Sequence, residues 1–506
     1  MLTNADEDIV ITKEVIYTDT FISHDSLIEQ DANIADSSSE HELKDLFPTA
    51  EQSDIDANKQ QNYRIWKKNS KILYDYINTN NLKWPSLSVN VLPYVNKAHN
   101  DRLFLITSFT SDQLPEDEKV ILTSMRTLNI PKSDLNSFEM ENMEFQVIKN
   151  IDSKSKKEHG LSSNKIDTTL AAKDEVIKEY KPQNLKNEIE ITYSPSEQCN
   201  RVAVNMNNPD IFATASTKFG NIYIYDKTKC VTTNSSVKNL MSSNHVINLN
   251  GFNASEDVEV TSLEWNNMKQ TELASGLSNG LLQVWDLRSS YKTDVTTYHE
   301  PTAFTVVDDT GVNDISYMPD HDSIIAVGCE NLYMQLFDTR AQNTILKTLN
   351  KNEKNSVNSL QFNPKNSNLI AVGSGDETGE INIHDIRRIQ TPVLTFNHSS
   401  ENTNNFISNN NSISKVQWNP FLPNVLLSAG MEDGLIKIWD TTAQQNASYT
   451  QKTFASKLIF THGGHMLGIT DCCWDLFDPW TVVSCSFDNA LQIWKPAKRI
   501  IDEYFI

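Results

Sequence analysis

Short segments of alternating apolar and polar residues recur along most of the chain, which is the pattern of half-buried β-strands. In each unit an alternating segment such as VTSLEWN (260–266) is followed by a turn and a small-residue segment such as LLSAG (426–430). A tight turn with Gly or Asn and a strand with an aromatic-acid signature, or its equivalent, complete the unit. The signatures end at Asp226, Asp286, Asp338, Asp385, Asp440 and Lys495. Such units are typical of WD-type propeller blades, which have roughly 40 to 45 residues plus loop insertions.

Two further segments, 102–110 and 119–127, predict strands of a seventh blade, and the strand WPSLSVNVLP (84–93) is expected to complete the final blade. Pairing the first and last parts of the chain in this way leaves no sheet edge open. The pattern therefore predicts an all-β fold, a seven-bladed WD-repeat β-propeller over residues 84–497. Polar insertion loops are expected near 149–188, 227–256, 396–412 and 441–456.

A helical pattern precedes the repeats. Apolar or small residues recur at three- and four-residue spacings at Tyr63, Trp66, Ser70, Leu73 and Ile77. This spacing predicts an N-terminal amphipathic α-helix over 61–80, which the Trp84-Pro85 pair follows as a stop signal. Ile72 and Tyr76 lie to one side of the buried stripe, where a partner could reach them; the alternative is that both belong to the core.

Charge narrows the class of partner. The chain of 506 residues has a formal net charge of −22, which argues against direct nucleic-acid binding and favours a basic protein partner. Residues 1–60 hold 15 acids and 3 lysines, an excess of 12 negative charges, and predict a disordered acidic tail. The tail either solvates the protein or attracts a cationic ligand. Neither a signal peptide nor an apolar run long enough to span a membrane is present, so we expect an intracellular protein without membrane contact.

Catalytic and metal-binding motifs are absent from the sequence. It contains no P-loop and no H-E-x-x-H, and its six cysteines show no C-x-x-C spacing. We therefore expect neither an enzyme nor a bound cofactor or metal. The His462–His465 pair is interpreted structurally, because the last unit matches the buried hydrogen-bond chain of WD repeats. That chain is expected to join His465, Ser484, Asp488 and Trp494.

Three segments carry a family resemblance. They are YRIWKKNSKILYDYINTNNLKWPSL (63–87), CNR (199–201) and FTHGGHMLGITDCCWDLFDPW (460–480). With them the chain resembles the retinoblastoma-binding (MSI-like) family of WD-repeat histone chaperones over nearly all of residues 61–497. Within that family it is most similar to the small WD-repeat subunit of the yeast-type chromatin assembly factor complex.

The resemblance implies two histone sites. A groove for the first helix of histone H4 would use Ile72, Leu73, Tyr76, Leu458 and Ile459. The mouth of the propeller would hold the basic tail of histone H3 through Asn200, Glu259, Glu330 and Asn358. Four mouth positions where the family tends to carry acids are here Gln198, Asn313, Ser412 and Phe487, and the loop 441–457 contains no acid.

The expected function is that of a non-catalytic histone H3/H4-binding subunit of a chromatin assembly complex, which supports replication-coupled nucleosome assembly. Its partners would be histones H3/H4 and the larger subunits of that complex, and it would reside in the nucleus, with the cytoplasm left open as a second location. One alternative is a histone-binding subunit of an acetyltransferase or deacetylase complex. The other is a generic WD-repeat adaptor without histone affinity.

Overall fold

The computed structural model describes residues 50–96, 101–111, 114, 117–126, 138–141, 143–145, 147–151, 177–181, 185–192, 197–229, 247–252, 254–289, 297–307, 310–331, 334–341, 343–348, 356–398, 411–442 and 457–505. The predicted tail therefore lies outside the described residues up to position 49. So do the central parts of the four predicted insertions.

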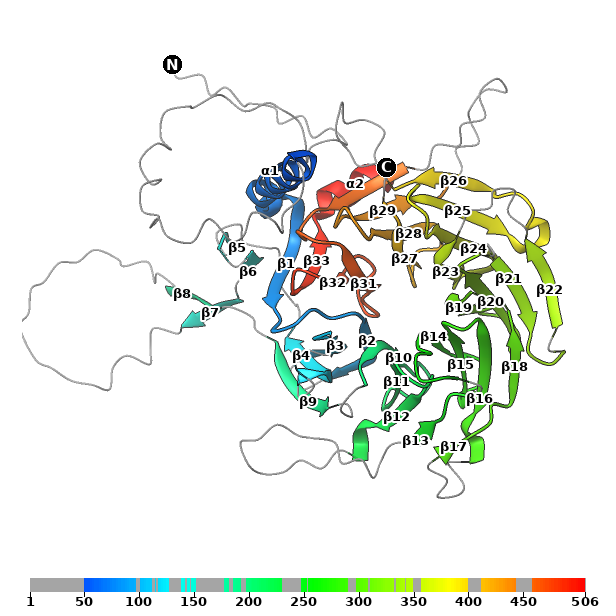
Figure 1. Ribbon diagram of the computed structural model, residues 1–506. Helices are drawn as coiled ribbons and strands as arrows, with labels where there is room; N and C mark the ends of the chain where they lie inside the picture. The colour runs from blue at the N-terminus through cyan, green and yellow to red at the C-terminus, as the bar shows by residue number, and fades with distance from the viewer. Residues whose placement is uncertain are drawn as a thin grey trace, which may run out of the picture.

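The described strands form seven sheets of four or five strands around a central axis, which confirms the predicted seven-bladed propeller (Figure 1). The first blade contains β2 (Val89–Asn96), β3 (Asp101–Ser108), β4 (Lys119–Arg126) and β9 (Lys186–Thr192). The second contains β10 (Cys199–Val204), β11 (Ile211–Ser216), β12 (Ile222–Asp226) and β13 (Ile247–Leu249), with β17 (Thr297–Tyr298) parallel to β13. The third contains β14 (Val260–Trp265), β15 (Glu272–Leu277), β16 (Leu281–Asp286) and β18 (Ala303–Val306).

The remaining blades repeat the same antiparallel order. The fourth contains β19 (Val312–Tyr317), β20 (Ile324–Cys329), β21 (Met334–Asp338) and β22 (Asn343–Thr348). The fifth contains β23 (Val357–Asn363), β24 (Asn366–Ser374), β25 (Glu380–Asp385) and β26 (Leu394–Asn397). The sixth contains β27 (Ile413–Trp418), β28 (Val425–Gly430), β29 (Ile436–Asp440) and β30 (Lys457–His462). The seventh contains β31 (Ile469–Trp474), β32 (Val482–Ser486), β33 (Ala490–Pro496) and β1 (Tyr74–Asn81).

Two helices and two hairpins stand outside the blades. Helix α1 spans Ala50–Leu73 and α2 spans Lys498–Phe505. Strands β5 (Phe138–Glu139) and β6 (Glu144–Phe145) pair, as do β7 (Val147–Ile151) and β8 (Ile177–Lys181), so the first predicted insertion begins and ends in strands. Short 3₁₀ turns follow three signature strands, at Lys227–Lys229, Leu287–Ser289 and Ile386–Arg388.

The predicted helix 61–80 is wrong at both ends. Helix α1 already begins at Ala50, inside the predicted tail, and it ends at Leu73. Residues 74–81 instead form β1, which pairs antiparallel with β33 from Tyr74 opposite Pro496 to Asn81 opposite Ala490. Without β1, the edge of β33 would leave a row of backbone groups unpaired. The hydrogen bonds between β1 and β33 therefore stabilise the strand more than the local helical pattern stabilises a helix.

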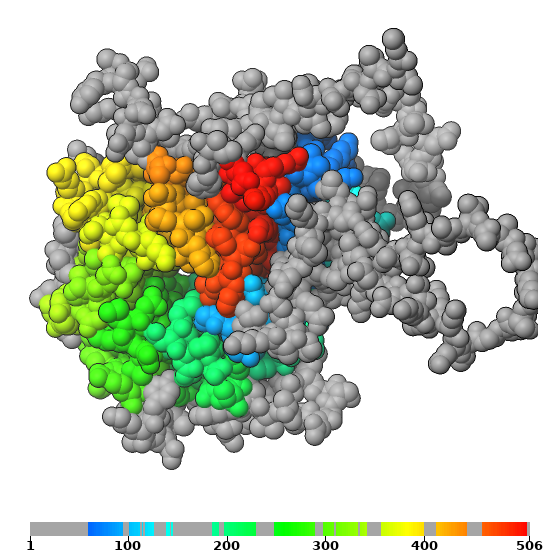
Figure 2. Space-filling view, turned by 180° about the vertical axis from the view of Figure 1, so that it is seen from behind, coloured from blue at the N-terminus to red at the C-terminus, as the bar shows by residue number. Residues whose placement is uncertain are grey.

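The predicted closing strand is wrong for the same reason. The segment 84–93 does not complete the final blade, because β1 already occupies that edge. Its second half, residues 89–93, contributes instead to β2, an end strand of the first blade's sheet that pairs with β3. The ring is still closed by joining the two ends of the repeat region, and Figures 1 and 2 both show the blue N-terminal segment against the red C-terminal residues.

Side-chain latches join the innermost strands of neighbouring blades. Asp471 Oδ2 accepts hydrogen bonds from the Val89 amide at 2.9 Å and the Ser88 hydroxyl at 3.1 Å, across the junction of the last and first blades. The Ser88 hydroxyl in turn accepts from the Val202 amide of the second blade at 3.3 Å. Latches from Asp314 to Leu360 and from Gln417 to Trp474 follow the same principle at 3.0 and 2.9 Å. These hydrogen bonds therefore fix the position of each joined blade along the propeller axis relative to its neighbour.

Helix α1 docks on the propeller through a buried polar chain. Trp66 Nε1 donates to the Tyr74 hydroxyl at 2.8 Å, and that hydroxyl lies 2.7 Å from His462 Nδ1. The His462 ring stacks on Trp494 with centroids 4.3 Å apart and an interplanar angle of 3°. Helix α1, β1, β30 and β33 thus meet in one core cluster. Burial holds the pKa of His462 well below its ordinary value, so the ring is neutral at physiological pH.

Replacing Tyr74 with phenylalanine should therefore destabilise the fold. The Tyr74→Phe variant leaves the Trp66 N–H and the His462 ring nitrogen without their shared partner, which should lower the free energy of unfolding by about 1 to 3 kcal/mol. The matched control is Tyr94→Phe, because Tyr94 is 45% exposed; its effect should stay within about 0.5 kcal/mol. Denaturant unfolding of the full chain measures both. Equal stability of the two variants would show that the hydroxyl does not hold the helix.

The buried histidines also predict a pH dependence. Burial lowers the pKa of His462, and likewise those of His384 and His398, so the unfolded chain takes up protons first when the pH falls below about 6.5. Stability should therefore be lost between pH 6.5 and 5, by at most about 1.4 kcal/mol per pH unit for each histidine. His462→Gln should make this slope shallower, while His299→Gln at an exposed position should not. Identical slopes for all three proteins would contradict the assignment.

Candidate functional site

The four residues expected at the mouth lie on one face of the ring. Because the strands of a blade alternate in direction, the start of each innermost strand and the end of the strand beside it share a face. Asn200 and Asn358 are second in β10 and β23, Glu259 directly precedes β14, and Glu330 directly follows β20. We call this the mouth face.

Only two of the four side chains touch each other. Asn200 Nδ2 donates to Glu259 Oε2 at 3.4 Å, which joins the second and third blades. The Ser278 hydroxyl accepts from the Glu259 amide at 3.1 Å and holds that backbone in place. Glu330 is exposed, and Asn358 lies on the next blade beside Gly375. The structure therefore places one partly buried and one exposed carboxylate on the mouth face.

Further carboxylates on the mouth face were missed in the sequence. Glu432, in the β28–β29 turn, accepts from the Ser412 amide at 2.6 Å and from the Ser412 hydroxyl at 2.8 Å. A carboxylate thus occupies the neighbourhood of Ser412, where the family resemblance had indicated a lost acid. Asp376 and Glu377 lie in the equivalent turn of the fifth blade. These acids could have been found from their shared place in the repeat, directly after the small-residue strand.

Another of the four departures is apolar. The Phe487 side chain is 47% exposed in the β32–β33 turn, and its amide donates to the Gly468 carbonyl at 3.2 Å. Met431 and Leu467, exposed by 41% and 49%, belong to the neighbouring turns. The mouth face is therefore acidic over the third to sixth blades and apolar between the sixth and seventh.

The residues expected in the groove do not all lie where the helical pattern placed them. Ile72 and Leu73 end α1, and Leu458 and Ile459 lie in β30. Leu73 and Ile459 are 5% and 4% exposed and belong to the same core cluster, whereas Ile72 and Leu458 are half-buried. Ile72 and Leu458 are thus the two that retain accessible surface.

Tyr76 does not lie where the helical pattern placed it. It lies in β1 rather than on the helix, and its side chain is only 2% exposed. Burial, with a contribution from the Glu144 carboxylate, raises the pKa of its hydroxyl. The helical spacing had placed Tyr76 at the edge of the buried stripe, but the two-residue period of a strand turns it into the core. A truncation at this position would test the packing of the core rather than ligand binding.

Helix α2 was missed, and it completes this region. Arg499 Nη2 donates to the Ile72 carbonyl at 2.6 Å, and the Ala497 amide donates to the Leu73 carbonyl at 2.8 Å. The Lys498 amide bonds Asp75 Oδ2 at 3.0 Å, which caps the first turn of α2. The C-terminal end of α1 is therefore fastened to α2, beside β30. The apolar residues at 500, 501 and 504 are the sequence signal for this helix.

The structure brings the expected hydrogen-bond chain of the last blade together. His465 Nε2 lies 2.8 Å from the Ser484 hydroxyl, which also accepts from Trp494 Nε1 at 3.2 Å, and His465 Nδ1 lies 3.4 Å from Asp488. The sixth blade has an equivalent chain that the sequence pattern did not reveal. It consists of His398, Ser428, Trp439 and Asp433.

Over the part of the chain that the structure describes, no group of three or more His, Cys, Asp or Glu side chains is arranged to hold a metal ion. None of the described helices combines the length and the apolar character needed to cross a membrane.

Comparisons with known proteins place the chain among its relatives. A family model of the histone-binding protein RBBP4, described also as one of the subunits of the CAF1 complex, matches residues 61–129, and a model of the WD domain, G-beta repeat, matches 400–440 and 456–495. A chain of the crystal structure of the mitotic checkpoint complex superposes with a TM-score of 0.50 at 13% identity, over 83% of this chain and 95% of that chain. At that identity the likeness shows the fold alone.

Two relatives match over most of their length. Histone acetyltransferase type B subunit 2 of Candida glabrata is 25% identical over 446 residues, which cover 87% of this chain and 89% of the relative. The histone-binding protein MSI1 of Saccharomyces cerevisiae is 36% identical over 466 residues, which cover 90% of this chain and 97% of MSI1. Identity at this level over nearly the whole of both proteins shows that the chain belongs to the MSI1/RBBP4 family of WD-repeat proteins.

Proposed function

We propose that the chain is a non-catalytic histone H3/H4-binding subunit of a chromatin assembly complex and supports replication-coupled nucleosome assembly in the nucleus. The observation that carries the proposal is the acidic mouth face, where Glu259, Glu330 and Glu432 lie on three separate blades. A basic, extended histone tail is the chemical complement of such a surface, because carboxylates spread over a ring can pair with successive lysines and arginines.

Two matches support the histone partner. MSI1 is named as a histone-binding protein, and the model that matches residues 61–129 is described by a histone-binding protein or a member of the CAF1 complex. The matched segment contains the end of α1 and all of β1. In the proposal, the first helix of H4 lies against α1, α2 and β30, with Ile72 and Leu458 as its accessible apolar contacts.

A second candidate function has its own support. The Candida glabrata relative is named as a subunit of a type B histone acetyltransferase, and its identity of 25% is lower than the 36% of MSI1. Purification of the tagged chain with its stoichiometric partners separates the candidates. An acetyltransferase or deacetylase catalytic chain among them would replace chromatin assembly as the role; no histone-linked partner at all would favour a generic WD adaptor.

Neutralising the mouth face should weaken histone binding. The double variant Glu259→Gln, Glu330→Gln removes two negative charges without adding bulk, and we expect its affinity for H3/H4 at about 0.15 M salt to fall about threefold to thirtyfold. The matched control is Asp320→Asn, because Asp320 is an exposed acid in the β19–β20 turn on the opposite face. Its affinity should equal that of the wild type in calorimetric titration. Equal losses in the control and the double variant would show that net charge alone, and not the mouth face, holds the histones.

A further inference from the structure

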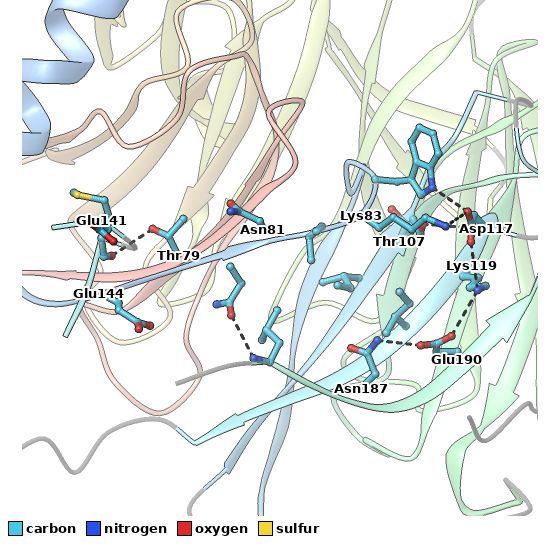
Figure 3. A pocket seen from close by; sticks show the side chains of 18 of the residues that line it. Thr79, Asn81, Lys83, Thr107, Asp117, Lys119, Glu141, Glu144, Asn187 and Glu190 are labelled. Atoms are coloured by element: carbon cyan, nitrogen blue, oxygen red, sulfur yellow. Dashed lines mark hydrogen bonds and ion pairs between the residues drawn. The ribbon is translucent and has the colours of Figure 1, made fainter. Parts of the chain in front are cut away.

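A groove of about 830 Å³ lies between the last and first blades (Figure 3). One wall is the end of β1, and the other is the face of the first blade formed by β3, β4 and β9. The β5–β6 hairpin and Tyr63 of α1 border it as well. Its lining therefore comes from both ends of the ring and from an insertion that interrupts the first blade.

The β1 wall presents a strand edge. Within the described residues β1 is the terminal strand of its sheet and pairs only with β33. Its other edge meets the insertion through side chains: Asn78 Nδ2 donates to Glu144 Oε2 at 2.7 Å, and the Leu185 amide donates to Asn80 Oδ1 at 3.3 Å. Residues 79–81 remain at least partly exposed. A short extended peptide can add to an edge of this kind by backbone hydrogen bonds.

One part of the lining, the floor of the groove, is apolar and suits an apolar side chain of a ligand. Ile106 and Ile121 of the first blade, Leu82 and Leu185 line it. Because successive side chains of an extended peptide point to opposite sides, one residue can pack on this floor while its neighbours reach the rims.

The two ends of the groove differ in charge. At one end Asp117 is neutralised by Lys83, with Nζ 2.5 Å from the carboxylate, and the hydrogen bonds from Lys83 and Trp84 hold the Asp117 pKa below its usual range. Glu190 at the same end lies 3.7 Å from Lys119. Glu141 and Glu144 lie at the other end, whereas both lining lysines lie at the end of Asp117 (Figure 3). Four acids against two lysines leave the lining with an excess of two negative charges.

Glu141 is the carboxylate available to a ligand. It is exposed, and it takes part in no ion pair within the described ranges. Glu144, beside it, is 2% exposed and held by Asn78. A lysine or arginine at this end could form an ion pair with the solvent-facing carboxylate of Glu141. It would also be attracted by the buried carboxylate of Glu144, because charge attraction is screened least where the dielectric constant is low.

We propose that this groove holds the basic N-terminal tail of histone H4 in an extended conformation, with a lysine or arginine at Glu141 and the tail backbone along residues 79–81. The inference rests on the proposed histone function and deepens it. Helix α1 borders both this groove and the surface proposed for the first helix of H4. Tyr63 at the groove and Ile72 at that surface are nine residues apart on α1, about 13.5 Å along its axis and on opposite sides, a separation that about five or six extended residues span.

The test combines one variant of this chain with one truncation of the ligand. Glu141→Lys in the full chain should weaken binding of H3/H4 about fivefold to tenfold, because it turns an attraction into a repulsion. The same variant should bind H3/H4 that lacks the H4 tail as tightly as the wild type does. Asp320→Lys on the opposite face is the control of equal charge change and should lose little with either ligand. Deuterium exchange at residues 79–81 should slow only when the H4 tail is present.

The outcomes separate this inference from the function on which it rests. If Glu141→Lys weakens binding equally with and without the tail, or with neither ligand, the H4 tail does not occupy the groove, while wild-type affinity for H3/H4 still supports the proposed function. Failure of the wild type to bind H3/H4 would overturn both. Since Glu141 is exposed, the variant should fold, and an unchanged thermal transition checks this; Glu144→Gln offers a second, isosteric variant of the same end.

Discussion

The antiparallel pairing of β1 with β33 is the constraint on which the rest of the structure depends. The first four strands of every other blade come from one continuous stretch, but the seventh needs a strand from more than 400 positions earlier, since Tyr74 pairs with Pro496. The ladder removes an open edge, and the Trp66–Tyr74–His462 chain ties α1 to it. A neutral, buried His462 is the condition for that chain, because a charged imidazole would face a large desolvation cost there.

Closing the ring also creates the surfaces that carry the proposed function. On one side of β1, the end of α1 is fastened to α2 next to β30, which forms the surface proposed for the H4 helix. On the other side, the end of β1 faces the first blade across the groove that contains Glu141 and Glu144. Helix α1 also contacts the mouth face, because the Lys59 ammonium group donates to the Glu432 carbonyl at 2.8 Å.

The repeats could be predicted because the same sequence pattern recurs in each blade, and all six signature strands indicate the same architecture. The register of β1 could not be predicted in this way. Leu73 and Ile77 satisfy a helical spacing, and the strand that makes this segment a β-strand, β33, lies at the other end of the chain. The site residues implied by the family resemblance show the same contrast between residues placed by the repeat and residues outside it. Glu259 and Glu330 lie on the mouth face, as a position in a repeat dictates, whereas Tyr76 depended on the misread segment and is buried. Glu432 also follows a small-residue strand, but its hydrogen bonds to Ser412 join two turns and could not be predicted from the repeat pattern.

We propose that shaped surfaces on this propeller, and not its net charge of −22, select histones H3/H4. The most direct measurement is titration of the purified full chain with H3/H4 and, separately, with the other core histone pair, at about 0.15 M salt and again at twice that concentration. We expect selective binding of H3/H4 that persists at the higher salt, because apolar contacts and partly buried pairs are screened little. Equal binding of both histone pairs that disappears when salt is doubled, or no binding of either, would contradict the account.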